Sequence, residues 1–477
     1  MWHAAGTVLV VLDWAVLGYF ILLNTTYLAL ILVAAAEFAR HLRRASYAGL
    51  DRAFASPLTP PVSVLVPAHN EEAGIVESVH AILGLRYPEF EVVVIEDGST
   101  DGTFERLRRA FDLVPVPRVL AADVPTAGEV LSTHVARDGR QLTVLRKVSV
   151  GTKTDALNVG INAARYPLLC MVDADAVLDS DALLRVAKPF VDDPWRVVAS
   201  GGVVRAVNGC RVERGRVVEV RMPRNWLVRI QVLEYLRAFL LGRTGWSRLD
   251  SLLIISGAFG LFRRDVVVEV GGLDPATLGE DAELVVRLHR HLRTARRDYR
   301  LIFVADPVCW TEIPATLSVL SRQRRRWARG LAELLWKHRA MVGNPRYGRI
   351  GLLGMPYYVA FEALAPVVEL GGLLAVAGGL LAGVVDWTFG ALFILVAIGY
   401  GVFLSLAALA VEEFAFHRYP RWRDLGVAIV AALLENLGYR QLHAWWRLRG
   451  LIAMIRGRPA TWGVMTRSGF QTRTAGR

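Results

Sequence analysis

Two carboxylates one residue apart stand directly after an apolar run at residues 168–172. The run predicts a short buried strand, and in extended backbone the side chains of residues i and i+2 point the same way, so Asp173 and Asp175 can face one ligand. Aligned carboxylate oxygens suit Mg²⁺ or Mn²⁺, and such ions usually keep some coordination positions for substrate phosphates. A polar turn after a strand is the ordinary explanation of an Asp-x-Asp pair taken alone, so the prediction of a metal site depends on its neighbours.

Two earlier strand-like segments also end in polar motifs. Residues 62–66 and 91–95 predict strands, and the segment at 75–83 between them has helical spacing. Strand, helix and strand in this order predict a parallel, doubly wound α/β sheet, which binds ligands at the carboxyl ends of its strands. The residues at these two ends are Pro67, Ala68, His69, Asn70, Glu71 and Glu72, and then Glu96, Asp97, Gly98, Ser99, Thr100, Asp101 and Gly102. With the Asp-x-Asp pair, they predict three acidic strand ends on one rim.

Three further segments hold groups suited to a phosphorylated substrate. Lys153 opens a predicted helix just before the central strand, where it can reach a pyrophosphate; a surface lysine near a helix cap is the alternative. Ser256 and Gly257 begin a glycine-containing segment after an apolar strand, which is typical of close backbone approach to a ligand or of a tight turn. Asp281, preceded by Glu280, stands at the start of a predicted helix. It is either an N-cap or a carboxylate able to take a proton from a hydroxyl group.

The composition predicts that part of the chain lies in a bilayer. Its 477 residues are 53% hydrophobic with a mean hydropathy of +0.35, which is too apolar for a wholly soluble protein. Residues 7–36 form an apolar stretch longer than the roughly 20 residues that cross a bilayer. Arg40, Arg43 and Arg44 follow it and, by the positive-inside rule, place the next part of the chain in the cytosol. No Lys or Arg precedes the stretch, which favours a retained span over a cleaved signal peptide.

The cysteines indicate the redox environment of the chain, and the net charge limits the kinds of binding partner that we expect. Cys170, Cys210 and Cys309 are isolated and lack metal-ligand spacing, so they predict a reduced cytosolic body rather than a disulfide framework. The net charge of +12 is compatible with nucleic acid, anionic lipid or a phosphorylated substrate. Because the arginines crowd near hydrophobic segments and form no recognisable nucleic-acid motif, we expect lipid head groups and an anionic substrate, and no nucleic acid.

The remaining segments predict a membrane part. Residues 112–141 have weak periodicity, and we expect an insertion or flexible excursion from the sheet. A basic amphipathic helix follows residue 314, and anchoring at the membrane interface is the ordinary explanation for most of its arginines. Two spans are expected at 352–384 and 387–411, joined by a hairpin at Asp386.

Polar groups complicate the C-terminal membrane segments. Glu362, Pro366 and Glu369 are costly in hydrocarbon and should face a protein or water-filled interior, which suggests a passage. The apolar segment at 425–446 precedes a basic tail whose export would violate the positive-inside rule. We therefore expect that segment to be re-entrant or interfacial.

Five motifs, taken in order, resemble those of the membrane-integrated family 2 glycosyltransferases, which include hyaluronan, cellulose, chitin and poly-N-acetylglucosamine synthases. They are Pro67-Ala68-His69-Asn70-Glu71-Glu72, Glu96-Asp97-Gly98-Ser99, Asp173-Ala174-Asp175, Gly279-Glu280-Asp281 and Gln323-Arg324-Arg325-Arg326-Trp327. The resemblance covers residues 58–330 and implies a GT-A fold, a Rossmann-like α/β domain with a mostly parallel sheet. The expected organisation is an N-terminal transmembrane helix (1–44), a GT-A domain (58–314), an interfacial helix with QxxRW (315–345), transmembrane and re-entrant helices (352–446) and a basic tail (447–477).

The resemblance also implies roles for the matching residues. Asp97, with Glu96 beside it, would hold the uridine of a nucleotide sugar, in a site that includes Pro67, His69, Asn70 and Glu71. Many relatives have Asp-Asp where this chain has Glu96-Asp97. Asp173 and Asp175 would bind the donor diphosphate, Asp175 through Mg²⁺ or Mn²⁺, with Lys153 as a further contact. Asp281, in the catalytic pair with Glu280, would be the general base, and Ser256, Gly257, Gln323, Arg326 and Trp327 would line the diphosphate and acceptor site.

These roles predict an inverting transferase. A metal on the diphosphate stabilises the leaving UDP, so one base suffices for a single in-line displacement that inverts the anomeric centre. The expected function is elongation of a β-linked polysaccharide from a UDP-sugar, with UDP-GlcNAc favoured, at the cytosolic face of the plasma membrane, and export of the polymer. The expected partners are the UDP-sugar, the growing polysaccharide, the bilayer and export or accessory subunits. A non-processive transferase that adds one sugar to a lipid and a non-catalytic membrane scaffold are the alternatives.

Overall fold

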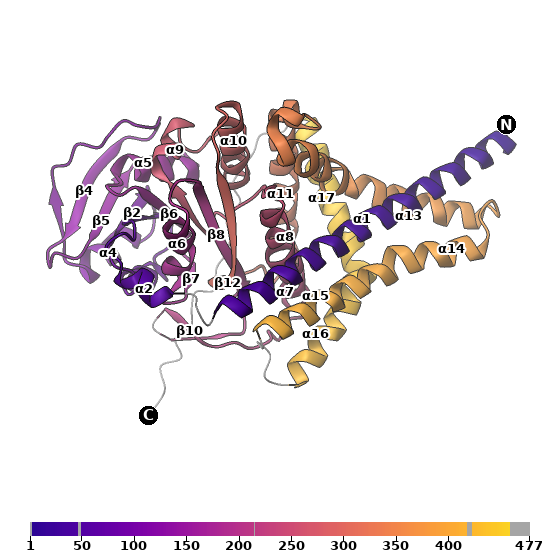
Figure 1. The fold of residues 1–477 in the computed structure, drawn as a ribbon, viewed down its shortest axis with the longest axis horizontal. Helices are drawn as coiled ribbons and strands as arrows, with labels where there is room; N and C mark the ends of the chain where they lie inside the picture. Colours follow the sequence, from indigo (N-terminus) through magenta and orange to yellow (C-terminus); the bar gives the residue numbers. More distant parts are fainter. Residues whose placement is uncertain (1, 46–48, 214, 417–421, 458–477) are drawn as a thin grey trace.

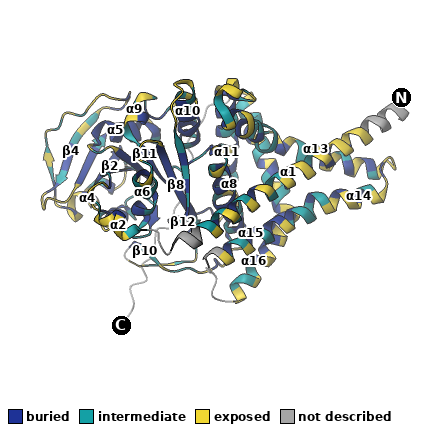
Figure 2. Cartoon of the chain, viewed as in Figure 1, coloured by how far each residue is buried: buried dark blue, intermediate teal, exposed yellow. Residues whose placement is uncertain are grey.

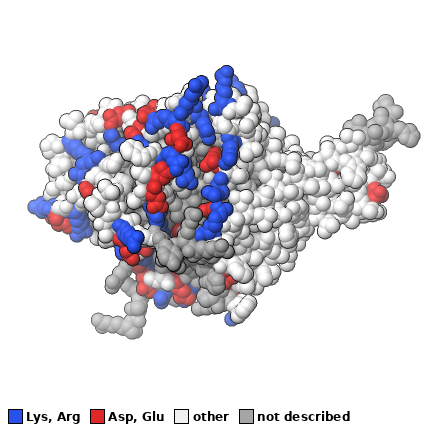
Figure 3. Space-filling model, in the orientation of Figure 1, with Lys and Arg blue, Asp and Glu red and all other residues white. Residues whose placement is uncertain are grey.

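The computed structural model describes residues 2–45, 49–213, 215–416 and 422–457. An α/β body built around one large sheet adjoins a helical part from which α1 (Trp2–Ala45), α13 (Ala365–Leu381) and α14 (Trp387–Ile394) extend away (Figure 1). Charged side chains cover the α/β body and are sparse on the visible face of the helical part (Figure 3). The division into a soluble body and an apolar helical part agrees with the hydropathy pattern.

The sheet has a parallel centre. Its ten strands run in the order β3-β4-β5-β2-β1-β6-β11-β8-β12-β7. The four central strands β5 (Leu142–Lys147), β2 (Phe90–Asp97), β1 (Val62–Ala68) and β6 (Leu168–Val172) pair in parallel. The outer strands add mainly antiparallel pairs; they are β3 (Leu113–Val116), β4 (Val130–Ala136), β11 (Phe259–Arg263), β8 (Val197–Ala206), β12 (Arg300–Thr311) and β7 (Val177–Leu178). The expected α/β architecture is confirmed.

Helices cover both faces of this parallel centre. Alternate residues of β1 belong to different cores, with Val64 in one and Leu65 in the other, because successive side chains of a strand point to opposite faces. The helix α3 (Ile75–Leu83) packs on the Val64 side and α5 (Lys153–Ala163) on the Leu65 side. Since both faces are buried (Figure 2), the central strands are continuously apolar rather than alternating.

The expectation of a flexible excursion at residues 112–141 is wrong. This segment contributes β3 and β4, which extend the sheet from β5 by antiparallel pairing. Pro115, which cannot donate a ladder hydrogen bond, lies in the edge strand β3, where this loss is tolerated. The weak periodicity arises because an edge ladder is held by backbone hydrogen bonds and needs little alternation of apolar side chains.

The apolar strand expected before Ser256 is also absent. Residues 251–256 carry no strand assignment, and the strand β11 follows the motif instead. Leu252, Leu253 and Ile255 are buried, so their apolar character reflects packing without ladder pairing. Short apolar runs do not by themselves distinguish these two arrangements.

Among the residues that the structure describes, two helices are long and apolar enough to cross a membrane, or three if one bent pair counts as a single span. The first lies within α1, at Val10–Arg40, and the second at Trp387–Phe414, where the π-helical segment η6 (Leu395–Gly399) joins α14 to α15 (Tyr400–Phe416). The bent pair joins Ile350–Ala363 to α13 at an angle of 43°. Pro366, in the first turn of α13, cannot continue the hydrogen-bond ladder and accounts for the break.

The segment expected to be re-entrant consists of two helices. The helix α16 (Trp422–Leu434) is separated from α17 (Arg440–Ile455) by non-helical backbone at Leu437 and Gly438. The helix α17 then returns against α11 (Leu317–Lys337) so closely that a Cβ atom at Gly450 would lie 2.5 Å from the carbonyl oxygen of Arg325. Most of the basic tail, residues 458–477, lies outside the described part of the chain.

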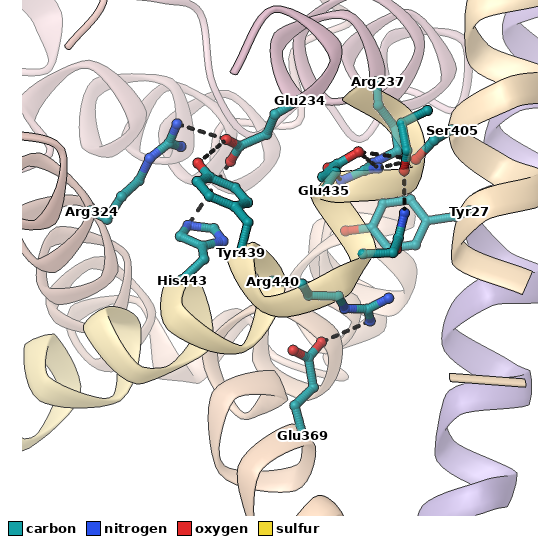
Figure 4. Close-up of polar contacts among 12 residues, drawn as sticks. Tyr27, Glu234, Arg237, Arg324, Glu369, Ser405, Glu435, Tyr439, Arg440 and His443 are labelled. Atoms are coloured by element: carbon teal, nitrogen blue, oxygen red, sulfur yellow. Dashed lines mark hydrogen bonds and ion pairs between the residues drawn. The ribbon is translucent and has the colours of Figure 1, made fainter. Parts of the chain in front are cut away.

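Ion pairs account for three acidic residues of the C-terminal helices. Glu369 pairs with Arg440 at 2.9 Å, and Glu435 pairs with Arg237 at 2.6 Å (Figure 4). Glu362, the other acidic residue flagged in the sequence, pairs with Arg447 and accepts a hydrogen bond from Tyr27. These acidic groups therefore face protein, which is one of the two environments expected from the sequence. Because each is paired with an arginine, their presence can be explained without a water-filled passage.

Candidate active site

The three acidic strand ends meet at one edge of the sheet. The strands β2, β1 and β6 are neighbours, and their register aligns Ala68 with Glu96 and Leu65 with Met171. Because all three strands run the same way, the residues that follow them emerge on the same rim. The predicted convergence is confirmed for the motifs at 67–72, 96–102 and 173–175.

The first two motifs are joined by hydrogen bonds into one double loop. A ring nitrogen of His69 lies 2.7 Å from the carbonyl oxygen of Asp97. Asn70 has a positive φ of 56° and accepts a hydrogen bond from the N–H of Thr100 at 2.8 Å, while Glu71 donates its N–H to the Thr103 hydroxyl at 2.9 Å. Pro67 pairs with Ile95 inside the sheet. These contacts give His69, Asn70 and Glu71 a role in shaping the loop.

The two acidic residues of the Glu96-Asp97 pair have different surroundings. Glu96 is buried, accepts a hydrogen bond from the N–H of Ser99 and pairs with Arg146 at 3.4 Å, so it holds the turn together. Asp97 is paired instead with Lys147, whose Nζ atom lies 2.6 Å from Oδ1. The two side chains are thus oriented by different cations.

Lys147 and Asp155 are residues of this site that the sequence did not reveal. Lys147 is fully buried and bridges Asp97 to Asp155, which lies 3.0 Å away. Asp155 also accepts the N–H groups of Ala127 and Gly128. Burial favours its protonated form, but Ala127, Lys147 and Gly128 together outweigh burial and lower the pKa of Asp155. In the sequence, the strand-like run at residues 142–147 ends in basic residues, which was the available signal for Lys147. The pairing of this run with β2 could be read only from the strand register.

The carboxylates of the Asp-x-Asp motif lie in a turn rather than in extended backbone. The strand β6 ends at Val172, and Ala176 donates its N–H to the carbonyl of Asp173 at 3.0 Å. The predicted reason for their convergence is therefore wrong. Burial and the negative charges of Asp173 and Asp175 raise the pKa of the Cys309 thiol well above its usual value.

A continuous set of contacts joins the Asp-x-Asp turn to the start of α10 (Glu280–Thr294). Lys153, the first residue of α5, forms an ion pair with Asp173 and donates to the carbonyl of Gly257 at 3.3 Å. The N–H of Gly257 donates in turn to Oδ2 of Asp281 at 3.0 Å. The peptide groups of one glycine thus link the lysine to the carboxylate, while Ser256 supports this turn through a hydrogen bond to Ala258.

Burial and neighbouring charges shift the pKa values of two residues in this set. Burial favours the neutral amine of Lys153, but the carboxylates of Asp173, Glu280 and Asp281 outweigh burial and raise its pKa. Burial and the adjacent charge of Asp281 raise the pKa of Glu280 to about 7. The helix α10 begins after Gly279 without a side-chain cap, so the N-cap alternative for Asp281 is not what the structure contains.

The donor set fits a metal ion that shares its ligands with a substrate. No group of three or more His, Cys, Asp or Glu side chains that could hold a metal converges within the ranges the structure describes. Asp173 and Asp175 supply two carboxylates, and Mg²⁺ in proteins is commonly bound by one or two carboxylates together with substrate phosphates. The residues are therefore compatible with a divalent cation bridged to a phosphorylated ligand.

The helix α11, which carries Gln323, Arg326 and Trp327, packs beside the start of α10 through Gly330. It approaches the turn before α10 so closely that a Cβ atom at Gly330 would lie 3.0 Å from the backbone nitrogen of Gly279. Gln323 and Arg326 are half-buried, and Trp327 is 38% exposed. The QxxRW helix is therefore packed directly against the start of the helix that carries Asp281.

Arg324, within the same motif, does not anchor the helix at an interface as expected. It is buried and pairs with Glu234 of α7 (Trp226–Tyr235) at 2.8 Å, and Tyr439, directly before α17, donates to the same carboxylate (Figure 4). The amphipathic pattern placed it on a charged face, but α7 and α17 cover that face. A buried carboxylate on another helix is invisible to local periodicity.

Comparison with known proteins agrees with this geometry. Residues 60–330 match the family described as glycosyltransferase-like family 2. Poly-beta-1,6-N-acetyl-D-glucosamine synthase of Staphylococcus epidermidis is 27% identical over 274 residues, covering 57% of this chain and 55% of that protein. The synthase of the same name from Staphylococcus aureus is 27% identical over 276 residues, with the same coverage. The chain thus matches about half the length of these curated relatives.

A solved structure shares the fold. The mannosyltransferase of Pyrobaculum calidifontis, in complex with GDP-Man and Mn²⁺, superposes with a TM-score of 0.52 at 20% identity, covering 89% of this chain and 99% of that one. The superposition confirms the predicted GT-A fold.

Proposed function

This chain belongs to glycosyltransferase-like family 2, and from that premise we propose that it transfers a sugar from a UDP-sugar to a growing saccharide at a membrane. The observation that carries the proposal is the continuous contact from Asp173 through Lys153 and Gly257 to Asp281. It joins groups suited to a diphosphate to a carboxylate suited to proton removal, on the ligand-binding rim of the sheet.

In this proposal, the double loop and the Asp-x-Asp turn bind the donor. Asp97, held by Lys147, accepts hydrogen bonds from the nucleotide base, and His69 and Asn70 shape the surrounding loop. Lys153 and Arg326 bind the diphosphate as cations. A divalent cation, Mg²⁺ or Mn²⁺, on Asp175 and Asp173 would neutralise charge on the leaving diphosphate.

Asp281 acts as the general base. Glu280, with its pKa near 7, is partly protonated at neutral pH, and the orientation of Asp281 is set by the N–H of Gly257. Asp281 takes the proton of the acceptor hydroxyl, the hydroxyl oxygen bonds to the anomeric carbon, and the bond from that carbon to the diphosphate oxygen breaks. A single displacement of this kind inverts the anomeric centre.

The relatives favour a particular donor and product. The two curated synthases are named for poly-β-1,6-N-acetylglucosamine, so we propose UDP-GlcNAc as donor and a β-linked polymer of N-acetylglucosamine as product. The apolar helices support a membrane location, and the arginines near the C-terminal end of α1 favour a cytosolic catalytic body. Export of the polymer, with or without accessory subunits, belongs to the same proposal.

The test is a donor screen with the full chain in lipid nanodiscs. UDP release is measured with a panel of UDP-sugars in Mg²⁺ or Mn²⁺, and products are sized and analysed for linkage. We expect UDP-GlcNAc to be used to make a polymer, and Asp281→Asn to lower the rate by roughly a hundredfold to ten-thousandfold. Release that survives Asp281→Asn unchanged contradicts the assigned base. A product carrying one sugar on a lipid supports the non-processive alternative, and no release with any UDP-sugar contradicts the donor class.

A further inference from the structure

Arg243 is a buried cation next to a widened turn of helix. It opens α8 (Arg243–Arg248) directly after the π-helical segment η1 (Leu236–Gly242), and it is only 5% exposed. Single turns of π-helix inside α-helices are frequent at functional sites. The helix is fixed behind Arg243, because a Cβ atom at Gly245 would lie 2.9 Å from the side chain of Leu30 in α1.

Arg243 has no counter-ion within the described residues. No carboxylate there lies within 4.0 Å of its guanidinium, and its Nη1 atom is buried without a hydrogen-bond acceptor. The guanidinium carbon lies 4.1 Å from the ring centroid of Phe239 and 5.9 Å from that of Phe303. Burial lowers the pKa of Arg243 to about 10, against an opposing attraction from Asp281.

Other buried arginines of the helical part behave differently. Arg324 is 4% exposed and stacks 4.6 Å from the ring centroid of Trp327, so it matches Arg243 in burial and in aromatic contact. It is nevertheless paired with Glu234, and Arg237 is likewise paired with Glu435 (Figure 4). A buried charge without a partner is unfavourable for folding. Residues that are unfavourable for folding in this way are expected at functional sites.

The position of Arg243 indicates what it binds. The Phe239 ring against which it stacks lies 6.5 Å from the ring of Trp327, in the QxxRW helix. Asp281 is the carboxylate whose attraction opposes the effect of burial on the pKa of Arg243. Arg243 is therefore placed on the side of the proposed base and Trp327.

We propose that Arg243 binds the acceptor saccharide, donating hydrogen bonds from its guanidinium to hydroxyl or acetamido oxygen atoms of the terminal sugar and holding the reacting hydroxyl beside Asp281. This assignment rests on the proposed function. A sugar supplies oxygen acceptors to a guanidinium that has none in the described protein, and the 38% exposed ring of Trp327 offers a flat apolar surface to the face of a sugar ring. The ligand class is a saccharide rich in neutral oxygen acceptors.

The test compares Arg243→Met and Arg243→Lys with the wild-type full chain, using a β-1,6-linked N-acetylglucosamine oligosaccharide as acceptor. We expect Arg243→Met to raise the KM for the oligosaccharide at least tenfold, to leave the KM for UDP-GlcNAc within twofold, and to retain transfer to water. Arg243→Lys should restore part of the acceptor affinity. Arg248→Met, on the same helix but with a side chain 49% exposed, is the activity control and should change none of these values.

Thermal unfolding separates acceptor binding from a structural role. Arg243→Met should melt at the same temperature as the wild type or higher, because it removes an uncompensated charge. Arg324→Met should melt several degrees lower, because it leaves Glu234 buried without its arginine. If Arg243→Met is destabilised as much as Arg324→Met, and the KM values for donor and acceptor rise together, the residue is structural and the proposal fails.

Direct binding makes the proposal independent of turnover. Equilibrium binding of the same oligosaccharide to wild type and Arg243→Met is measured by calorimetry in the presence of UDP and Mg²⁺. Weaker binding to the variant supports the assignment, and equal binding overturns it. A wild-type protein that releases no UDP from any UDP-sugar contradicts the proposed function in its own assay, so the two failures are distinguishable.

Discussion

The Nζ atom of Lys147 lies 2.6 Å from Oδ1 of Asp97, and no part of the lysine side chain is exposed to solvent. The ammonium also pairs with Asp155, so one buried cation neutralises two buried carboxylates from different elements. Removing one member of such a set leaves uncompensated charge in the interior. Lys147 is therefore expected to stabilise the fold and to orient Asp97.

We predict that Lys147→Met lowers the free energy of unfolding by about 3 to 5 kcal/mol, the usual loss when a buried pair is broken. It should also raise the KM for the UDP-sugar, because Asp97 loses its orientation. Chemical unfolding in detergent and donor titration measure the two effects. The matched control is Lys188→Met, whose ion pair with Asp192 is partly exposed and should contribute no more than about 0.5 kcal/mol. Equal effects of the two substitutions would contradict the prediction.

Gly330→Ala should lower kcat roughly tenfold to a hundredfold. The added methyl group would lie 3.0 Å from the backbone nitrogen of Gly279, so α11 must move away from the turn that precedes Asp281. Small misplacements of groups around a reacting centre have effects of this size. Gly378→Ala in α13 is the control, since a methyl group there meets no atom within 4 Å. Steady-state UDP release checks both variants, and an unimpaired Gly330→Ala enzyme would rule out a need for this close approach.

Glu280 should make stability depend on pH between about 4.5 and 7. Burial and the charge of Asp281 raise the pKa of Glu280 from 4.5 to about 7, so the folded state holds a proton that the unfolded state releases in this range. Stability from this group is thus present below pH 4.5 and is lost as the pH rises to about 7, by about 3 kcal/mol in total.

Glu280→Gln removes this titration. The variant should gain stability over the wild type as the pH rises from 4.5 to 7, and the difference should stay constant above that range. Melting temperatures of both proteins from pH 4 to pH 8 measure the effect. A difference that is the same at every pH would show that Glu280 does not titrate in this interval.

Removal of the divalent cation should abolish transfer. A chelator is expected to stop UDP release, and added Mg²⁺ or Mn²⁺ should restore it, because in the proposed site Asp173 and Asp175 supply two carboxylates and the substrate completes the coordination. Asp175→Asn should raise the metal concentration needed for half-maximal rate about tenfold or more. Activity that persists in chelator with the wild-type protein would exclude a metal requirement. Asp192→Asn, on the exposed face of α6 (Ala182–Asp192), serves as control.

The sequence by itself determined the central strands, the helices between them and the rim on which the acidic motifs lie. These features depend on local patterns, since an apolar run of five to eight residues predicts a buried strand and the parallel connection places its carboxyl end at the ligand edge. Asp97, Asp173 and Asp281 could be found in this way because each follows or opens an element with a clear pattern.

Only the tertiary structure decided which charges are paired and which segment completes the sheet. Lys147 lies 50 residues from Asp97, and Arg324 lies 90 residues from Glu234, so their pairing depends on register and helix packing that no local periodicity encodes. The place of β3 and β4 in the sheet also depends on the tertiary structure, because backbone hydrogen bonds to a neighbouring strand hold them. The surroundings of Arg243 likewise depend on the tertiary structure. The residue type and position of Arg243 are visible in the sequence, but the lack of a counter-ion among the described residues is a property of the space around it.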